Sequence, residues 1–475
     1  MLQIDDAITP SDLVEPIERM WTRSAECLDA LERDWKPADG SPVFTVEGRY
    51  TSQGWTEWTQ GFQFGSAILQ FDATGDERFL EQGRAATVKY MAPHVSHTGV
   101  HDHGFNNIST YGNLRRLMLE GRIPHNQAEL DFYELALKIS GAVQARRWRP
   151  CENDLGYIYS FNGPHSLFSD TIRSLRSLAI AHQLGHKLMG EGDCAISLLT
   201  RLIKHAKATA KYNVYYGEGR DTYDFPGRVA HESIFNTVNG VYRCPSTQQG
   251  YSAFTTWTRG LAWIILGYAE QLEFLKTVPN SEKSGLGGHS EIEAFMLRAA
   301  CATCDFYIGN MPTDGIPYWD TGAPGLAGLG LYMTRPADPF NNYEPVDSSA
   351  AAIACQGLIR LGRYLRTKPD DKLLRIGDTY ISAGLTVLRK LLHEPYLSSD
   401  PRHQGLLLHS IYHRPNGWDH VPEGRAIPCG EACMWGDYHL REAALYVGRL
   451  ADDKDYTFFG PKPEPEFKLA KGMTD

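Results

Sequence analysis

Four aspartates stand at or near the starts of helix-like apolar patterns, where a carboxyl group can cap a helix or act on a substrate. They are Asp102, Asp170, Asp347 and Asp437. Capping explains any one of them, because aspartate accepts backbone N–H bonds and faces the positive end of the helix dipole. Two carboxyl groups in one pocket would instead indicate a catalytic role, since hydrolysis and hydration of sugars use such a pair. Burial, or the charge of its partner, keeps one of the two protonated.

Three histidines surround the first of these aspartates in the stretch HTGVHDHGF, residues 97–105. His97, His101 and His103 could in principle bind a metal together with Asp102, but their spacing matches no standard metal site. We therefore expect neither a metal nor another cofactor. The preferred functional interpretation directs Asp102 into a pocket, with His101 and His103 as neighbours that tune its charge.

Aromatic residues crowd the same helix starts, and together they favour a pocket that stacks on the apolar face of a pyranose ring. The set comprises Trp55, Trp58, Phe62, Phe105, Trp257, Trp263, Trp319 and Trp435. Taken singly, each is better explained by core packing. Arg259 follows Trp257 by two residues, and a buried guanidinium requires an anion. A substrate carboxylate would serve, and so would an aspartate of the pocket.

Six segments predict buried inner helices, because each opens with polar, glycine or tryptophan residues and continues with small and apolar residues on most faces. They are 58–71, 103–119, 169–185, 255–272, 346–365 and 434–450. Segments with a stronger polar face lie between them and predict outer helices, among them 76–91, 127–147 and 370–392. Alternating inner and outer helices, six of each, predict an all-α (α/α)6 barrel. A helical protein of two domains is the alternative.

We expect one catalytic domain over residues 1–475, with a short N-terminal extension and a C-terminal tail from about residue 452. The starts of the inner helices would meet at one end of the barrel, so functional side chains should gather there. Residues 212–254, rich in Gly, Tyr, Thr and Asn, predict a long excursion over that mouth. Few segments alternate with the period of two that is typical of strands.

The overall composition excludes several classes of protein. A net charge of −10 disfavours nucleic acid as a partner, and no apolar run is long enough to span a membrane. The nine cysteines show no disulfide rhythm, and the acidic N-terminus does not resemble a signal peptide. We therefore expect a cytoplasmic protein with reduced thiols. The sequence does not distinguish a monomer from a homodimer.

Several motifs, in order along residues 40–450, carry a resemblance to a known family. They are GWTEWTQGF, HDHGF, SDT, QGYSAFTTWTRGLAW, GIPYWDTGAP, DSSAAAIA, LLLHSIYHRPNG and MWGDY. With these pieces and an intact Trp-x-Arg-Gly-x-Ala-Trp spacing, the chain resembles the unsaturated glucuronyl hydrolases, glycoside hydrolase family 88. The unsaturated rhamnogalacturonyl hydrolases of family 105 are the related group. The fold that this resemblance implies is again the (α/α)6 barrel.

The resemblance implies a hydrolase that takes oligosaccharides made by polysaccharide lyases and releases the terminal unsaturated uronic acid. Water adds across the C4=C5 double bond of that sugar, and the anomeric carbon is not attacked. An aspartate matching Asp170 protonates C4 and activates water for C5, while a second, matching Asp102, lies close by and is needed for activity. One carboxyl group must therefore hold a proton near neutral pH.

The resemblance also implies which residues bind the substrate. His231 and Gln249 would lie near the C5 carboxylate and the attacking water, and Arg259 would bind the uronate. The sugar ring would be lined by Trp58, Trp257 and Trp263.

Two departures from the family pattern fall where the rest of the oligosaccharide would bind. The segment SDTIRS replaces the more usual Asp-Thr-Met-Met, and the region between Asp170 and Gln249 is longer. An unsaturated uronate joined to rhamnose, as in pectin or ulvan fragments, is therefore an alternative substrate. Two further readings stay open, a non-catalytic carbohydrate-binding barrel in which all four aspartates are caps, and an ordinary inverting hydrolase.

Overall fold

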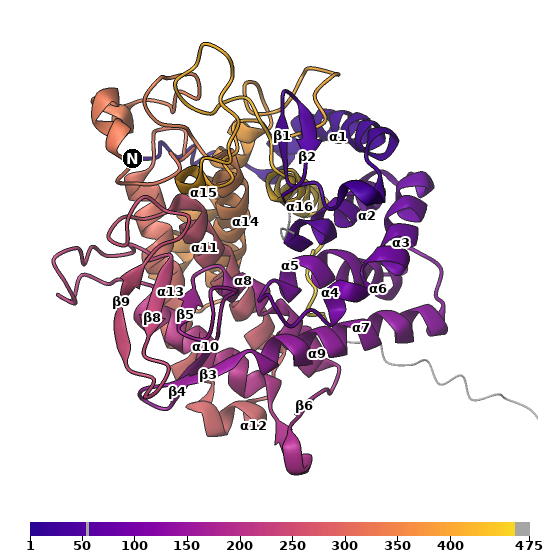
Figure 1. The fold of residues 1–475 in the computed structure, drawn as a ribbon, viewed down its shortest axis with the longest axis vertical. Coiled ribbons are helices and arrows are strands. Elements are labelled where there is room, and N and C mark those ends of the chain that lie inside the picture. The colour runs from indigo at the N-terminus through magenta and orange to yellow at the C-terminus, as the bar shows by residue number, and fades with distance from the viewer. Residues whose placement is uncertain (54–56, 461–475) are drawn as a thin grey trace, which may run out of the picture.

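The computed structural model describes residues 1–53 and 57–460, and in this part of the chain the long helices form two concentric rings (Figure 1). The inner ring comprises α2 (Gln60–Thr74), α5 (His103–Asn107), α6 (Asn113–Leu119), α8 (Thr171–Ser174), α9 (Arg176–Gln183), α11 (Thr258–Thr277), α14 (Ser348–Leu365) and α16 (Met434–Ala451). The outer ring comprises α1 (Val14–Asp34), α3 (Glu77–Tyr90), α7 (Gln127–Arg146), α10 (Leu198–Tyr212), α13 (Gly288–Asn310) and α15 (Asp371–Leu391). Helix α5 continues through a π-helical turn into α6, and α8 leads directly into α9.

Each inner helix packs against the next, and α16 returns to α2, so the inner ring is closed. This is the predicted (α/α)6 barrel, and the predicted inner segments coincide with the inner helices. Composition explains the difference between the rings. Every residue of α14 except Arg363 is buried, whereas α15 buries one face only. Small residues let α14 approach its neighbours closely, since a Cβ at Gly357 would lie 2.7 Å from the backbone nitrogen of Leu266 in α11.

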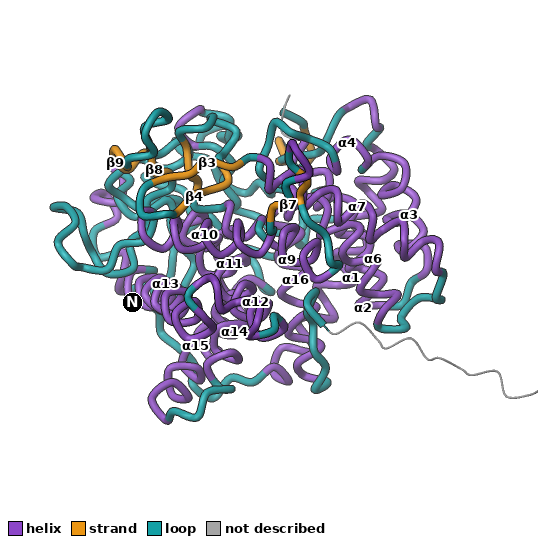
Figure 2. The backbone as a smooth tube through the Cα atoms, turned by 90° about the horizontal axis from the view of Figure 1, so that it is seen from below, coloured by secondary structure: helices purple, strands orange, loops and turns teal. Residues whose placement is uncertain are grey.

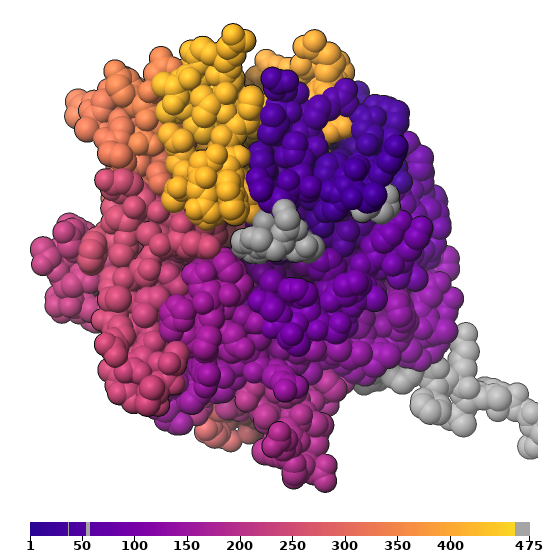
Figure 3. All heavy atoms as spheres, in the orientation of Figure 1, coloured from indigo at the N-terminus to yellow at the C-terminus, as the bar shows by residue number. Residues whose placement is uncertain are grey.

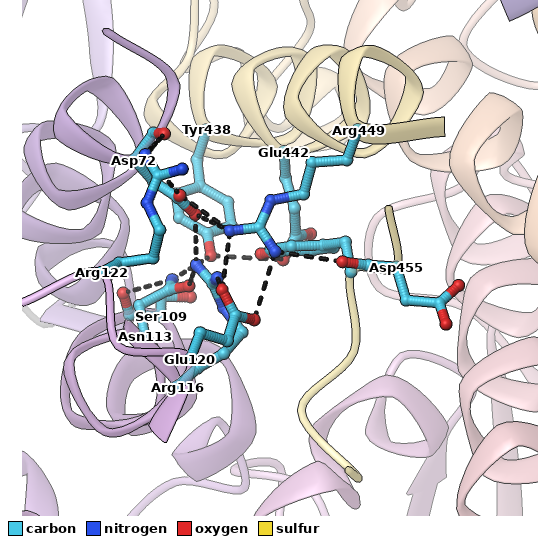
Figure 4. A network of polar contacts seen from close by, with 11 residues as sticks. Asp72, Ser109, Asn113, Arg116, Glu120, Arg122, Tyr438, Glu442, Arg449 and Asp455 are labelled. Atoms are coloured by element: carbon cyan, nitrogen blue, oxygen red, sulfur yellow. Dashed lines mark hydrogen bonds and ion pairs between the residues drawn. The ribbon is translucent and has the colours of Figure 1, made fainter. Parts of the chain in front are cut away.

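An ion cluster joins the first and last inner helices at the end of the barrel away from the helix starts (Figure 4). Asp72, near the C-terminus of α2, has a fully buried side chain and accepts from Arg116 of α6 at 2.7 Å and from Arg449 of α16 at 2.8 Å. Burial alone would raise the pKa of Asp72, but the two guanidinium groups outweigh it and hold the pKa below its ordinary value. The cluster thus closes the ring electrostatically.

A second set of buried charges links the inner helices to one another. Arg173 of α8 lies 2.9 Å from a carboxylate oxygen of Glu270 in α11 and 3.0 Å from one of Glu442 in α16. Arg176 of α9 approaches the same two carboxylates. All four side chains are at most 1% exposed, so the charges are compensated inside the barrel and not by water.

Short antiparallel sheets connect the helices, and most of their strands gather toward one end of the barrel (Figure 2). They are β1 (Phe44–Val46) with β2 (Arg49–Thr51), β3 (Trp148–Cys151) with β4 (Leu155–Ile158), β6 (Leu188–Met189) with β7 (Ala195–Ile196), and β5 (Ser166–Phe168) with β8 (Glu232–Phe235) and β9 (Tyr242–Ser246). The last sheet corrects our expectation for residues 212–254, which contain two strands and not only loops. Strands of four or five residues are too short for alternation to be distinctive.

The N-terminal segment lies against the last part of the chain. Phe44 of β1 bridges Cys433, and Met434 N donates to the carbonyl of Val43 at 2.8 Å. On the face shown in Figure 3, the indigo N-terminal segment accordingly lies beside the yellow C-terminal part. None of the described helices is both long and apolar enough to cross a bilayer.

The closing cluster predicts a pH-dependent loss of stability in Asp72→Asn. The variant leaves Arg116 and Arg449 buried without their carboxylate, which should lower the free energy of unfolding at pH 7 by about 3–5 kcal/mol. Because the pKa of Asp72 is depressed, its contribution is complete above the ordinary aspartate pKa of about 4 and is lost as the pH falls through the folded-state value. Urea unfolding from pH 7 down to pH 3 should therefore show the gap between the two proteins shrinking.

Asp29→Asn is the matched control, because Asp29 pairs with Arg78 on the surface with 42% of its side chain exposed. It should cost less than about 1 kcal/mol. Equal losses for the two variants would show that the buried cluster does not hold the ring closed.

Candidate active site

A pocket opens where the inner helices begin, and it is lined mostly by aromatic rings, carboxyl groups and imidazoles. Its walls are Trp58, His101, Asp102, Phe105, Phe161, Asp170, Gln248, Gln249, Trp257, Arg259, Trp263, Tyr412, His413 and Trp418. The structure therefore brings Asp102, Asp170, Gln249 and Arg259 together with the three predicted tryptophans. Trp55, which the sequence also placed at this rim, lies outside the described residues.

Asp102 and Asp170 stand at the N-caps of α5 and α8, but neither side chain bonds the free N–H groups of its helix. Both are buried, with 7% and 8% of the residue exposed. His101 lies between them. Its Nε2 is 3.2 Å from an Asp170 carboxylate oxygen and 3.8 Å from one of Asp102. The two helix starts therefore deliver their carboxyl groups to one imidazole instead of capping.

The other two aspartates are structural. Asp347 caps α14 by accepting from Ser349 N at 3.1 Å. Asp437, in the first turn of α16, accepts from the backbone N–H groups of Leu406 and Leu407 and from the Tyr50 hydroxyl at 2.8 Å. The capping explanation thus holds for Asp347, while Asp437 secures a neighbouring loop, and the remaining pair stays available for chemistry.

The electrostatics of the three groups differ. Burial raises the pKa of Asp102, and the Asp170 charge adds to this. Burial would also raise the pKa of Asp170, but the charge and hydrogen bond of His101 outweigh it, so that pKa lies below the ordinary value. For His101, burial opposes protonation while both carboxylates favour it, and its pKa is raised. These shifts favour an ionised Asp170 beside a protonated His101.

Packing keeps His101 in place. Its ring stacks on Phe161 and meets Phe168 edge-on. Its carbonyl accepts from Gln144 Nε2 at 2.8 Å and from the Ser174 hydroxyl at 2.6 Å. The imidazole is consequently fixed by α7, by α8 and by strand β5, and not only by the two carboxylates.

His231 lies just behind the pocket wall, next to strand β8. Pairing of β8 with β5 sets its position, because Ser169 N, one residue before Asp170, donates to the His231 carbonyl at 2.8 Å. Its Nδ1 accepts from Gln248 N at 3.0 Å, so Nε2 carries the ring proton. Burial lowers the pKa of His231 to about 4. The ring is thus neutral at neutral pH and presents a buried N–H that bonds no other described residue.

Arg259 lies at the pocket floor, and the anion beside it is an aspartate of the protein. Its Nη1 donates to Asp347 at 2.7 Å, and Nη2 donates to Gln249 Oε1 at 3.0 Å. Of the two anions that sequence reasoning allowed for this guanidinium, the structure supplies the internal one.

The predicted role of His103 is wrong. Its ring turns away from Asp102, contacts the Ser140 hydroxyl at 3.0 Å and lies 2.8 Å from the carbonyl of His97. Burial lowers its pKa to about 4. Of the three histidines in the stretch 97–105, His101 is the one that contacts both carboxyl groups. Within residues 1–53 and 57–460, no three His, Cys, Asp or Glu side chains are arranged to hold a metal ion.

Several pocket residues were not predicted from the sequence, and several residues that were predicted at the pocket rim do not line it. Phe161, Gln248, Tyr412, His413 and Trp418 line the pocket, and the last three come from the loop whose motif LLLHSIYHRPNG marked the family resemblance. That motif was the available signal. The predicted rim residues Phe62, Trp319 and Trp435 are instead buried behind the wall.

A helical barrel with an acidic, aromatic pocket at its mouth is typical of proteins that act on carbohydrates. Comparisons with known proteins show which of these the chain is similar to. No family model matches the chain. An unsaturated glucuronyl hydrolase of Formosa agariphila is 26% identical over 389 residues, which cover 82% of this chain and 79% of the relative. An unsaturated glucuronyl hydrolase of Bacillus sp. strain GL1 is 24% identical over 438 residues, which cover 90% of this chain and 97% of the relative.

Solved structures show the same fold. An unsaturated glucuronyl hydrolase specific for heparin superposes with a TM-score of 0.68 at 18% identity, over 93% of this chain and 99% of that one. An unsaturated glucuronyl hydrolase variant from Streptococcus agalactiae, complexed with dGlcA-GalNAc6S, superposes with a TM-score of 0.61 at 19% identity, over 96% and 98%. These likenesses confirm the (α/α)6 barrel. With the curated relatives, they confirm that the chain is related to the unsaturated glucuronyl hydrolases over most of its length.

The contrast between the aspartates predicts different effects on stability. Asp437→Asn places an amide N–H against donors and should lower the free energy of unfolding by about 1–3 kcal/mol. Asp102→Asn breaks no bond to its own helix and should change it by less than about 0.5 kcal/mol. Urea unfolding at pH 7 measures both. A loss in Asp102→Asn as large as in Asp437→Asn would mean that Asp102 is a structural residue.

Proposed function

We propose that this protein is an unsaturated glucuronyl hydrolase. It takes oligosaccharides generated by polysaccharide lyases and releases the non-reducing-end Δ4,5-unsaturated uronic acid by hydrating the C4=C5 double bond. One observation carries the proposal. Asp102 and Asp170 share His101 in an aromatic pocket and leave the helix N–H groups beside them unbonded. A carbohydrate-binding barrel without activity has no use for this arrangement.

Asp170 moves the proton. A bound substrate brings a carboxylate, and added negative charge favours protonation of neighbouring groups. The proton on His101 then passes along the 3.2 Å contact to Asp170, which delivers it to C4. The same carboxylate takes a proton from the water that adds at C5 and returns it to His101. No proton is consumed in the cycle, and no cofactor is required.

The rest of the reaction follows from the chemistry of the product. Hydration leaves a hemiketal at C5, and the bond from C5 to the ring oxygen breaks to give a ketone at C5 and a hemiacetal at C1. The glycosidic bond at C1 then breaks, which releases the remaining sugar chain as an alcohol and leaves an aldehyde. One water is used in all. Because the anomeric carbon is never attacked, an acid and a base on opposite sides of it are not needed.

Asp102 supports this transfer from the other side of His101. Its charge favours the protonated imidazole, which keeps a proton available beside Asp170. The rings of Trp58, Trp257 and Trp263 surround the sugar, and His231 lies behind the pocket wall with a buried ring N–H that bonds no other described residue. Nine unpaired cysteines among the described residues suit the reducing cytoplasm, where we place the protein.

The sugar beyond the cleaved bond is set by the pocket mouth and not by the carboxyl pair. The related proteins illustrate this, since one is described as specific for heparin and another was solved with dGlcA-GalNAc6S. Unsaturated uronyl-rhamnose fragments are the alternative substrate. A panel of lyase-generated oligosaccharides from chondroitin, hyaluronan, heparin, xanthan, ulvan and pectin, followed by loss of the enoate's ultraviolet absorbance, tests the function and identifies the partner sugar together.

The same assay tests the two aspartates. Asp170→Asn should lower kcat on the order of 10⁴-fold, because it removes both the proton donor and the group that activates water. Asp102→Asn should lower kcat on the order of 10²-fold, since His101 keeps one of its two carboxylates. Asp305→Asn on the outer helix α13 is the control and should retain full activity. A folded Asp170→Asn protein with a normal rate would contradict the proposed function.

A further inference from the structure

Arg259 lines the pocket but is almost completely covered by other residues. Its guanidinium lies over two indole rings, with Cζ 4.6 Å from the ring centroid of Trp257 and 4.9 Å from that of Trp435. The residue is 1% exposed. Contact with two aromatic rings stabilises the cation within the protein.

The two terminal nitrogens of Arg259 are also fully used in hydrogen bonds within the protein. Nη1 donates to the Asp347 carboxylate at 2.7 Å and to the carbonyl of Ile411. Nη2 donates to the carbonyl of Tyr412 at 2.6 Å and to Gln249 Oε1 at 3.0 Å. All four hydrogens of the two terminal nitrogens are therefore committed, and Asp347 compensates the charge. A substrate carboxylate could bind these nitrogens only by displacing one of the four acceptors.

The contact with Gln249 fixes the orientation of that amide. Arginine offers donors and no acceptor, so the atom of Gln249 that faces it must be the carbonyl oxygen. The NH2 group then points to the opposite side of the amide. Because Gln249 lines the pocket, its free end is a donor aimed at whatever the pocket holds.

We propose that Arg259 is a positioning residue and not a ligand of the substrate: it locks the Gln249 amide so that Nε2 donates to the carboxylate of the unsaturated uronide. This inference rests on the proposed function. The family resemblance placed both Gln249 and Arg259 at the uronate, and the inference keeps Gln249 as the donor but gives Arg259 the indirect role of holding it.

The same guanidinium sets one wall of the pocket. By holding the carbonyls of Ile411 and Tyr412 it fixes the loop that carries His413. Asp419 holds the loop from the other side, accepting from the backbone N–H groups of Tyr412 and His413. Lysine at position 259 would keep the charge beside Asp347, but a compact ammonium cannot span four acceptors as the planar fork does.

A double-mutant cycle separates positioning from direct binding. Gln249→Met removes the amide with little change in shape, and Arg259→Lys removes the fork but keeps the charge. On an unsaturated chondroitin disaccharide, Gln249→Met should raise KM roughly tenfold to a hundredfold, the worth of one hydrogen bond to a charged group, with kcat changed less than about threefold. Arg259→Lys should raise KM roughly tenfold in the Gln249 protein, but less than about threefold when Met already occupies position 249.

The same KM factor for Arg259→Lys in both backgrounds would overturn the inference, because it would mean that Arg259 affects substrate binding by a route other than Gln249. Arg360→Lys is the matched control. Arg360 is also 1% exposed and pairs with Glu273 at 2.8 Å, but it lies outside the pocket lining, so KM should not change.

A measurement without substrate distinguishes failure of this inference from failure of the proposed function. If no unsaturated uronide is hydrolysed by the unsubstituted protein, the proposed function is wrong, and with it the ligand of Gln249. The bond between the two residues is still tested, because the shifts in the urea midpoint caused by Gln249→Met and Arg259→Lys should then be clearly non-additive. Strictly additive shifts would overturn the locked amide whatever the substrate.

Discussion

The contact of one imidazole with two buried carboxyl groups is the constraint on which the site depends. His101 lies 3.2 Å from Asp170 and 3.8 Å from Asp102, and three titratable groups this close share their protons. Two like charges would repel in a buried pocket without the imidazole between them. The barrel supplies the positions, since α5 and α8 are neighbours in the inner ring and begin at the same end. Helix packing thus brings together the three groups among which the protons of the pocket are shared.

The barrel separates stability from function along its length. Some charged groups that hold the ring together, such as Asp72 with Arg449, lie where the inner helices end. Others, such as Arg173 with Glu270, link one inner helix to the next inside the barrel. Asp102 and Asp170, which do not cap their helices, lie where the inner helices begin. Structural charges also occur at this end, among them Asp437 and the ion pair of Arg259 with Asp347, which joins two inner helices and also orients a pocket amide. A change at Arg259 should therefore disturb folding and substrate binding together.

Local pattern in the sequence was sufficient for the barrel and for four aspartates at helix starts, and the family resemblance selected Asp102 and Asp170 from these four. Six apolar segments with little polar face coincide with the inner helices, and helix starts marked Asp102 and Asp170. Contacts between segments far apart in the chain could not be predicted from local sequence pattern. Asp347 lies 88 residues after Arg259, and no local pattern shows that the two pair, or that His413 reaches the pocket from a loop. Strands β8 and β9 were missed because short paired strands carry little periodicity.

Isotopic labelling of the released uronate tests the central claim most directly, namely that the pocket hydrates a double bond and does not attack the anomeric carbon. In heavy water, protonation by Asp170 should place one deuterium at C4. In water labelled with oxygen-18, a brief single turnover analysed before the product aldehyde exchanges should place the label at C5. Recovery of the oxygen label at C1 with no deuterium at C4, or comparable hydrolysis of a saturated glucuronide, would contradict the account and show an ordinary inverting hydrolase.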